Sequence, residues 1–187
     1  MAAIAPQPST LRSCNRARGF TLAELLIVVA IVAILAALVV PPYNDAIARA
    51  RVKDATEHIH GLVLLAKNEG RIRDVNLSLA VNSDAWCVGV APFPNCDCTL
   101  GDGAGACVLP VAGQPVLQTV LGDAFPGVAV SGNLTGTTFY RIRGNASPGG
   151  TIAITAREQT LEIKIGLTGR ARVCAPSGSH FSGYPGC

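Results

Sequence analysis

Residues 18 to 26 read Arg-Gly-Phe-Thr-Leu-Ala-Glu-Leu-Leu and begin an apolar run that continues to Val40. Glu24 is the only acidic residue in this run. A carboxylate at the centre of a bilayer costs about 3 kcal/mol, so an acid at this position needs a function and a partner. The residues before the run include Arg12, Arg16 and Arg18 and no acid. This stretch therefore predicts a chain that is processed, inserted into a membrane and then used in an assembly.

The apolar run is long enough to cross a membrane as one helix. Residues 20 to 40 are uncharged except for Glu24, and about 20 residues span the hydrocarbon core of a bilayer. An ordinary secretory signal is cut after its apolar segment, whereas here a basic segment precedes the run. We expect a cleaved leader over residues 1–19 and a retained transmembrane or filament-core helix over residues 20–42. A plain signal anchor is the alternative, but it leaves Glu24 and the Gly19–Phe20 junction unexplained.

Pro41 and Pro42 follow the apolar run and predict a kink or local melting, because proline removes a helix donor and clashes with the preceding turn. Beyond them the helical pattern resumes as an amphipathic helix over residues 43–72. We expect one face of this second segment to pack on a globular domain. Its apolar positions are Ile47, Ala55, Ile59, Leu62 and Ala66.

From residue 73 onward, short β-branched runs alternate with clusters of Gly, Pro, Asn and Asp. This pattern is typical of antiparallel sheet. The fold class is therefore α+β, with a globular β-domain and a basic C-terminal tail over residues 73–187. We expect strands at 75–81, 86–90, 107–111, 116–121, 128–130, 138–143, 151–155, 161–165 and 170–174.

Charge is distributed unevenly along the chain. The formal charge of +3 becomes zero if the leader is cut after Gly19, because 12 basic and 12 acidic residues then remain. Residues 82–127 contain four acids and no Lys or Arg, whereas the chain from Arg141 to its end contains six bases and two acids. The C-terminal part is thus the better candidate for an anionic partner.

The cysteines indicate an oxidising compartment. Cys14 lies in the leader, and an even set of six remains, which favours disulfides in an exported domain. Cys96 and Cys98 are too close for an easy mutual bond, and a Cys174–Cys187 bond is plausible, but the connectivity stays open. Four thiolates binding zinc is the alternative, and we expect no metal because the chain is exported. The candidates are Cys87, Cys96, Cys98, Cys107, Cys174 and Cys187.

The sequence Gly19-Phe20-Thr21-Leu22-Ala23-Glu24 with its apolar helix resembles the class III signal of type IV pilins and type II secretion pseudopilins. The resemblance implies that prepilin peptidase cuts between Gly19 and Phe20 and that the new N-terminus is methylated. It also implies that Glu24 pairs with the amine of a neighbouring subunit's Phe20, and that the helix can melt at Pro41 during assembly. Ala23 is a minor departure, because a larger aliphatic residue is more usual there.

Three further stretches resemble the FimT/GspH group of minor pilins: residues 49–52 (RARV), 62–69 (LVLLAKNE) and 167–174 (LTGRARVC). This resemblance implies the type IV pilin fold, a long N-terminal helix packed on an antiparallel two-sheet β-domain. In some FimT-type members a Gly-Arg-x-Arg motif contributes to binding extracellular DNA during natural transformation. The matching residues here are Gly169, Arg170 and Arg172.

The two arginines of this motif suit a phosphate backbone. They are two residues apart, so on a strand they share a face, and a guanidinium is a forked donor for phosphate oxygens. Such contacts support sequence-independent DNA binding. Arg141 and Arg143 share a face of their own predicted strand and would extend the patch. The alternative is an ordinary solvated strand face. If the DNA is single-stranded, the tail residues His180, Phe181 and Tyr184 could stack on bases.

No nucleophile–base pair, paired acids or phosphate-binding glycine loop stands out, so we expect neither an enzyme nor a bound cofactor. The resulting hypothesis is a minor pilin that begins as a single-pass inner-membrane protein with a periplasmic domain and ends in the extracellular pilus. Its expected partners are prepilin peptidase, the inner membrane, other pilin subunits through the N-terminal helix, and DNA. A GspH-type pseudopilin of a type II secretion system and a pilus-priming subunit without a ligand remain as alternatives.

Overall fold

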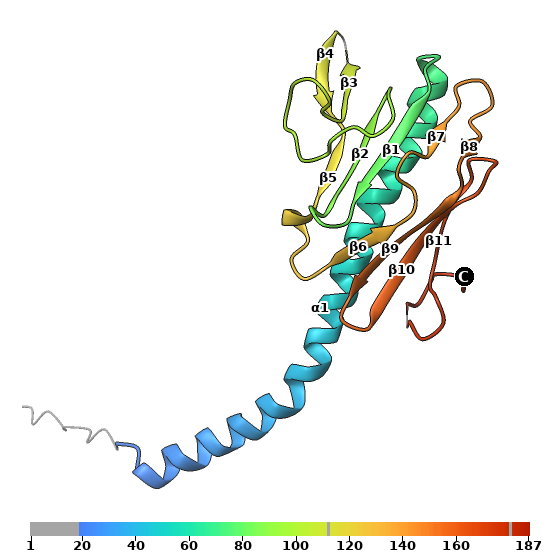
Figure 1. The fold of residues 1–187 in the computed structure, drawn as a ribbon. Helices are drawn as coiled ribbons and strands as arrows, with labels where there is room; N and C mark the ends of the chain where they lie inside the picture. The colour runs from blue at the N-terminus through green and yellow to red at the C-terminus, as the bar shows by residue number, and fades with distance from the viewer. Residues whose placement is uncertain (1–18, 112, 180) are drawn as a thin grey trace, which may run out of the picture. The chain divides into compact units, whose positions relative to one another are not determined.

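The structure is a computed structural model that describes residues 19–111, 113–179 and 181–187, with the backbone alone described over 38–42 (Figure 1). The predicted leader up to residue 18, including Cys14, lies outside the described residues, as does His180. The chain divides into two compact units between Pro41 and Pro42.

Helix α1 (Leu22–Ile72) begins directly after Thr21. The Oγ1 atom of Thr21 accepts a hydrogen bond from the Glu24 amide at 3.2 Å, which satisfies one of the free donors of the first turn. Glu24 lies in that turn, where the helix dipole favours a negative charge. The local chemistry of Thr21 and Glu24 thus explains where the helix starts.

The helical assignment continues through Pro41 and Pro42. The described backbone is therefore helical at the two prolines and shows no local melting there. The kink and the melting during assembly stay predictions. In the first unit, the apolar side chains from Phe20 to Leu35 are exposed. Among the described residues, no helix combines the length and the apolar character needed to cross a membrane. The span expected over residues 20–42 stays a prediction.

In the second unit, α1 buries one face. Val52, Ala55, Ile59 and Val63 have no exposed area, and their spacing of three and four residues puts them in one stripe along the helix. The stripe packs against the strands in a single hydrophobic core. The amphipathic pattern in the sequence thus corresponds to the face of the helix that the β-domain covers.

Two antiparallel sheets and a separate hairpin form the β-domain, which confirms the predicted two-sheet fold (Figure 1). The first sheet has the order β5-β2-β1-β7-β8 and the second the order β11-β10-β9-β6. The first comprises β1 (Leu77–Asn82), β2 (Cys87–Ala91), β5 (Thr119–Leu121), β7 (Thr138–Phe139) and β8 (Ala146–Ser147). The second comprises β6 (Ala129–Gly132), β9 (Gly150–Ala156), β10 (Gln159–Ile165) and β11 (Ala171–Cys174). The hairpin is β3 (Val108–Val111) with β4 (Gln114–Leu117), and a short 3-10 helix, η1 (Gly122–Ala124), follows β5.

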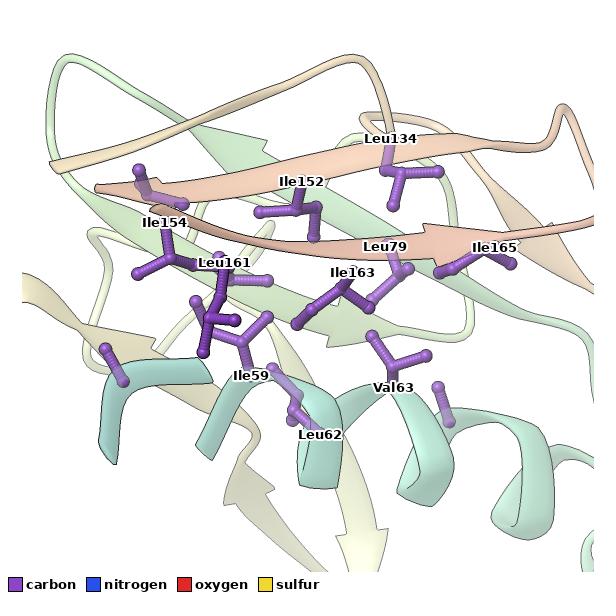
Figure 2. Close-up of a cluster of buried hydrophobic side chains, with 14 of the residues drawn as sticks. Ile59, Leu62, Val63, Leu79, Leu134, Ile152, Ile154, Leu161, Ile163 and Ile165 are labelled. Atoms are coloured by element: carbon purple, nitrogen blue, oxygen red, sulfur yellow. The ribbon is translucent and has the colours of Figure 1, made fainter. Parts of the chain in front are cut away.

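The core lies between α1 and the sheets. Alternate residues of β9 and β10 point inward, and Ile154, Leu161 and Ile163 are fully buried. Figure 2 shows these side chains above Ile59 and Leu62 of the helix. Burying a side chain of this size contributes about 1.5–3 kcal/mol. This packing joins β9 and β10 to the helix.

The strand predicted over residues 138–143 is wrong beyond Phe139. Strand β7 ends there, and residues 140–145 form a turn that leads into β8. Tyr140 closes this turn: its amide donates to the Asn145 carbonyl at 2.9 Å, and its carbonyl accepts from the Gly144 amide at 2.8 Å. The segment forms a turn because Gly144 adopts a φ of 65°, which other residues rarely adopt.

Other strand boundaries also shift. The segment predicted at 116–121 divides into β4 and β5, because the Gln118 amide donates to the Cys107 carbonyl at 2.8 Å instead of continuing one ladder. The last strand begins at Ala171 and not at Arg170. Arg170 is therefore the final residue of the preceding turn.

Three disulfides join the six candidate cysteines: Cys87–Cys98, Cys96–Cys107 and Cys174–Cys187. Cys96 and Cys98 each bond elsewhere, and the four sulfurs considered for zinc are bonded to one another in pairs. The Cys87–Cys98 bond ties the loop after β2 to that strand, and the Cys96–Cys107 bond joins the two ends of the loop that precedes β3. A Cβ at Gly89 would lie 2.3 Å from the Cys107 Sγ, so this strand position requires glycine.

Candidate DNA-binding surface

The Gly-Arg-x-Arg motif begins in a tight turn between β10 and β11. The Gly166 amide donates to the Arg170 carbonyl at 3.1 Å, and the Gly169 amide donates to the Gly166 carbonyl at 2.8 Å. Gly169 has a φ of 69°, in the left-handed region where glycine carries no side-chain penalty. Glycine at this position therefore allows the turn that presents Arg170.

This turn rests on the turn at residues 140–145. A Cβ added at Gly169 would lie 1.9 Å from the Gly144 carbonyl oxygen, so the two backbones approach too closely for any side chain. The Ala146 amide also donates to the Leu167 carbonyl at 3.1 Å. Since Arg143 and Arg170 directly neighbour the two touching glycines, the structure brings these two arginine-bearing turns together.

Arg170 and Arg172 are both exposed. Arg172 lies on β11 directly opposite Lys164 of β10, and like charges in this position destabilise a sheet. Lys164 pairs with Glu162 at 3.2 Å, whereas Arg170 and Arg172 make no ion pair with any residue that the structure describes. An anion bound near Arg172 would relieve the repulsion between it and Lys164.

Arg141 and Arg143 do not share a strand face as predicted, because both lie in the turn. The Nη1 atom of Arg141 is 2.7 Å from the Asp74 Oδ2 atom, and its backbone amide donates to the Asn76 Oδ1 atom at 3.1 Å. These contacts join the turn to the segment that follows α1. Arg143 is exposed and, within the described residues, has no ion-pair partner. The two arginines therefore differ, one anchored and one free.

Two cations of the candidate surface were missed by reasoning from sequence. A Cβ at Gly144 would lie 3.2 Å from the Cδ atom of Arg71 and 3.4 Å from the Cε atom of Lys67, so both stems lie along the turn. Their spacing of four residues puts them on one side of α1, which was a usable signal. Nothing in the sequence indicates that residues 140–145 pack there. We define the basic surface as Lys67, Arg71, Arg141, Arg143, Arg170 and Arg172.

The two described aromatic residues of the tail contact the rest of the domain. Phe181 and Tyr184 are partly buried against the core and meet edge to face, with ring centroids 6.1 Å apart. The Tyr184 hydroxyl reaches the Glu57 Oε1 atom of α1 at 3.5 Å. Partial burial and the Glu57 carboxylate raise the pKa of Tyr184. The tail therefore packs on the domain, and the stacking predicted for these two rings stays a prediction.

Replacing both Cys174 and Cys187 by Ser should lower the free energy of unfolding by about 3 kcal/mol, the loop-entropy value for a closed loop of this size. Hydrogen exchange should locate the effect. The Thr160 amide donates to Ser179 Oγ in the tail at 3.1 Å, so it should exchange faster in the variant. The Ile163 amide, in the middle of β10, should exchange faster only by the factor that the global loss of stability sets. Equal acceleration at both amides would contradict a local role for the bond.

Gly19 and Phe20 are exposed at the start of the described chain, and Glu24 is exposed in the first turn of α1. The structure contains a single chain. Cleavage, methylation and pairing of Glu24 with a neighbouring Phe20 therefore stay predictions.

Comparison with known proteins gives two independent similarities. Residues 14–40 match the model of the prokaryotic N-terminal methylation motif. A fimbrial protein of Moraxella nonliquefaciens is 54% identical over 48 residues, which are 26% of this chain and 31% of that protein. A type IV major fimbrial protein FimA of Dichelobacter nodosus is 56% identical over 45 residues, 24% of this chain and 28% of its own length. The matched segment thus spans less than a third of these relatives.

The second similarity is in the fold. The type IV minor pilin FimU of Pseudomonas aeruginosa superposes with a TM-score of 0.50 at 16% identity, over 71% of this chain and 97% of FimU. The minor pseudopilin EpsH of Vibrio cholerae gives a TM-score of 0.44 at 10% identity, over 68% of this chain and 96% of EpsH. The FimU match shows the type IV pilin fold. The chain thus combines a prokaryotic N-terminal methylation motif over residues 14–40 with the type IV pilin fold.

Proposed function

We propose that this chain is a minor pilin that joins a type IV pilus through its N-terminal helix and binds extracellular DNA through the basic surface, for natural transformation. The main support for DNA binding is the close contact between Gly169 and Gly144. Because of this contact, cations from α1, the β7–β8 turn and the β10–β11 turn lie near one another. Phosphate contacts by Lys and Arg supply most of the affinity in sequence-independent DNA binding. One acid, Asp74, pairs with a member of this surface among the described residues.

The assembly part of the proposal rests on the N-terminus. Prepilin peptidase cuts between Gly19 and Phe20, the new N-terminus is methylated, and the helix holds the subunit in the inner membrane. Glu24 then pairs with the amine of a neighbouring Phe20 as the subunit leaves the membrane for the filament. The exposed apolar side chains of the first unit suit burial first in lipid and then among other helices, and no catalytic role is proposed.

A second candidate function is that of a GspH-type pseudopilin, whose β-domain would contact protein partners. The acidic residues Asp84, Asp97, Asp102 and Asp123, in a segment without Lys or Arg, favour it, since such a segment suits a basic protein surface. A pilus-priming subunit without a ligand is a further alternative, and its β-domain would likewise contact only other proteins. Both alternatives predict that the purified chain binds no DNA.

Replacing both Arg170 and Arg172 by Ala should weaken duplex DNA binding at least tenfold. Two phosphate contacts are lost, so the slope of log K against log salt should become less steep by about 2. The measurement is fluorescence anisotropy with a labelled duplex across a salt series. It uses the full-length chain in a non-ionic detergent, because the N-terminal apolar side chains are exposed.

The matched control removes two arginines elsewhere, by Arg49→Ala and Arg157→Ala. Arg157 pairs with Asp45 at 3.2 Å in the turn before β10, whereas the motif follows the other end of that strand. The control changes net charge equally, so it should leave the slope nearly unchanged. If the Arg49/Arg157 variant loses as much affinity as the Arg170/Arg172 variant, then DNA binding depends on the overall charge of the protein and not on the basic surface.

A further inference from the structure

A groove of about 470 Å³ lies on the turn between β7 and β8. Its volume is within the range of small-molecule binding sites. The lining side chains combine an aromatic ring, an aliphatic group, two amides and two guanidinium groups. They belong to Asn76, Tyr140, Arg141, Ile142, Arg143 and Asn145.

The apolar members of the groove face water. Tyr140 is 41% exposed and Ile142 is 77% exposed, and neither belongs to the hydrophobic core. Large apolar side chains at the tip of a turn gain nothing from folding while they remain in water. An aromatic ring with an adjacent aliphatic group offers a flat surface on which a planar ligand can stack.

The polar members are positioned before any ligand binds. Asn76 accepts the Arg141 backbone amide at 3.1 Å, and the Arg141 guanidinium is held by Asp74 at 2.7 Å. These contacts fix both side chains beside the ring at a low cost in conformational freedom. Carboxamide and guanidinium groups are the side chains that most often pair with base edges. The groove thus has the chemistry to bind a nucleobase by both its face and its edge.

Further cations lie beside the turn that forms this groove. The side chains of Lys67 and Arg71 pack along Gly144 of the turn, and the turn bearing Arg170 touches the same glycine. A positive track that follows a phosphate backbone, combined with an aromatic side chain for base stacking, is the arrangement found in proteins that bind single strands. In a duplex the faces of the bases are covered by their neighbours, so the ring at Tyr140 would have nothing to stack on.

We propose that this groove binds an unpaired nucleobase, so that the basic surface takes single-stranded DNA in preference to duplex DNA. This inference rests on the proposed function, because it names the form of DNA bound by the same surface. The phosphates flanking the base contact Arg143 and Arg170, and the base stacks on Tyr140. No covalent step is involved.

The test compares a fluorescein-labelled 20-nucleotide single strand with its duplex, both titrated with the full-length chain in detergent at fixed salt. The wild type should bind the single strand about tenfold more tightly. Tyr140→Leu keeps an apolar side chain but removes the ring, and it should reduce this preference about tenfold. Tyr140→Phe retains the ring and should retain the preference. Ile142→Ala, at a position too exposed to affect folding, should reduce it less.

The matched control is Tyr43→Leu, the same change at an exposed tyrosine of α1 outside the groove, which should leave the preference unchanged. Equal affinity of the wild type for both forms, or an unchanged preference in Tyr140→Leu, would overturn the inference. The proposed function would survive that result if the Arg170 and Arg172 double variant still lost affinity. A wild type that binds neither form would overturn both.

Discussion

Gly169→Ala is expected to lower the free energy of unfolding by about 2–5 kcal/mol. The left-handed backbone at this residue costs a non-glycine residue about 1–2 kcal/mol. The new Cβ would also lie 1.9 Å from the Gly144 carbonyl oxygen, and relieving such overpacking costs about 1–3 kcal/mol more. Chemical denaturation of the full-length chain, followed by circular dichroism, measures the sum.

Gly178→Ala is the matched control for this prediction. Gly178 has a φ of 92°, but nothing lies within 4 Å of its added Cβ. It should therefore show the backbone penalty without the clash, and a smaller loss of stability than Gly169→Ala. If the two variants lose equal stability, the close approach of the two turns is not what requires glycine at 169.

Gly169→Ala should also weaken DNA binding, because separating the two turns would move Arg170 away from Arg143. Gly169 would then act by positioning, without a contact of its own to DNA. The loss should be measured well below the unfolding midpoint of the variant. A fully folded Gly169→Ala variant with unchanged affinity would show that the two turns need not touch for DNA to bind.

Leu62→Ala is expected to cost about 2–5 kcal/mol of stability, the usual result of removing a buried leucine from a packed core. Leu62 is 8% exposed and lies under the sheet in Figure 2. The measurement is again the free energy of unfolding. If the free energy of unfolding fell by less than about 1 kcal/mol, the packing of Leu62 would contribute little to the stability of the core.

Leu64→Ala supplies the control, because it makes the same substitution two residues further along the same helix. Leu64 is 40% exposed, and the change in helix propensity is identical. It should cost less than about 1 kcal/mol, since exposed substitutions have small effects. The difference between the two variants thus measures packing alone.

Much of the fold could be predicted because its signals are local. The predicted apolar positions Ala55, Ile59, Leu62 and Ala66 are buried, and their spacing of three or four residues is visible within a short stretch of sequence. The alternation in β9 and β10 is equally direct. The prediction failed over residues 140–143, where an Arg-Ile-Arg pattern suits a strand but Gly144 and the hydrogen bonds of Tyr140 close a turn.

The candidate site was predicted in part. The motif glycine and the exposure of Arg170 and Arg172 followed from short-range patterns. Lys67 and Arg71 were missed, because their membership depends on a contact with Gly144, more than 70 residues away in the chain. The contact of the tail with α1 through Tyr184 and Glu57 also joins distant parts of the chain, and no local pattern predicted it.

The sequence by itself determined the N-terminal methylation signal, the amphipathic helix, the alternating strands and the six candidate cysteines from Cys87 to Cys187. Each of these depends on residues close together in the chain. Only the tertiary structure decided which cysteines bond, where β7 stops, and that Gly169 seats one arginine-bearing turn on another beside α1. These features arise from contacts between distant segments, whose geometry is set by the packing of the whole core and not by any local pattern.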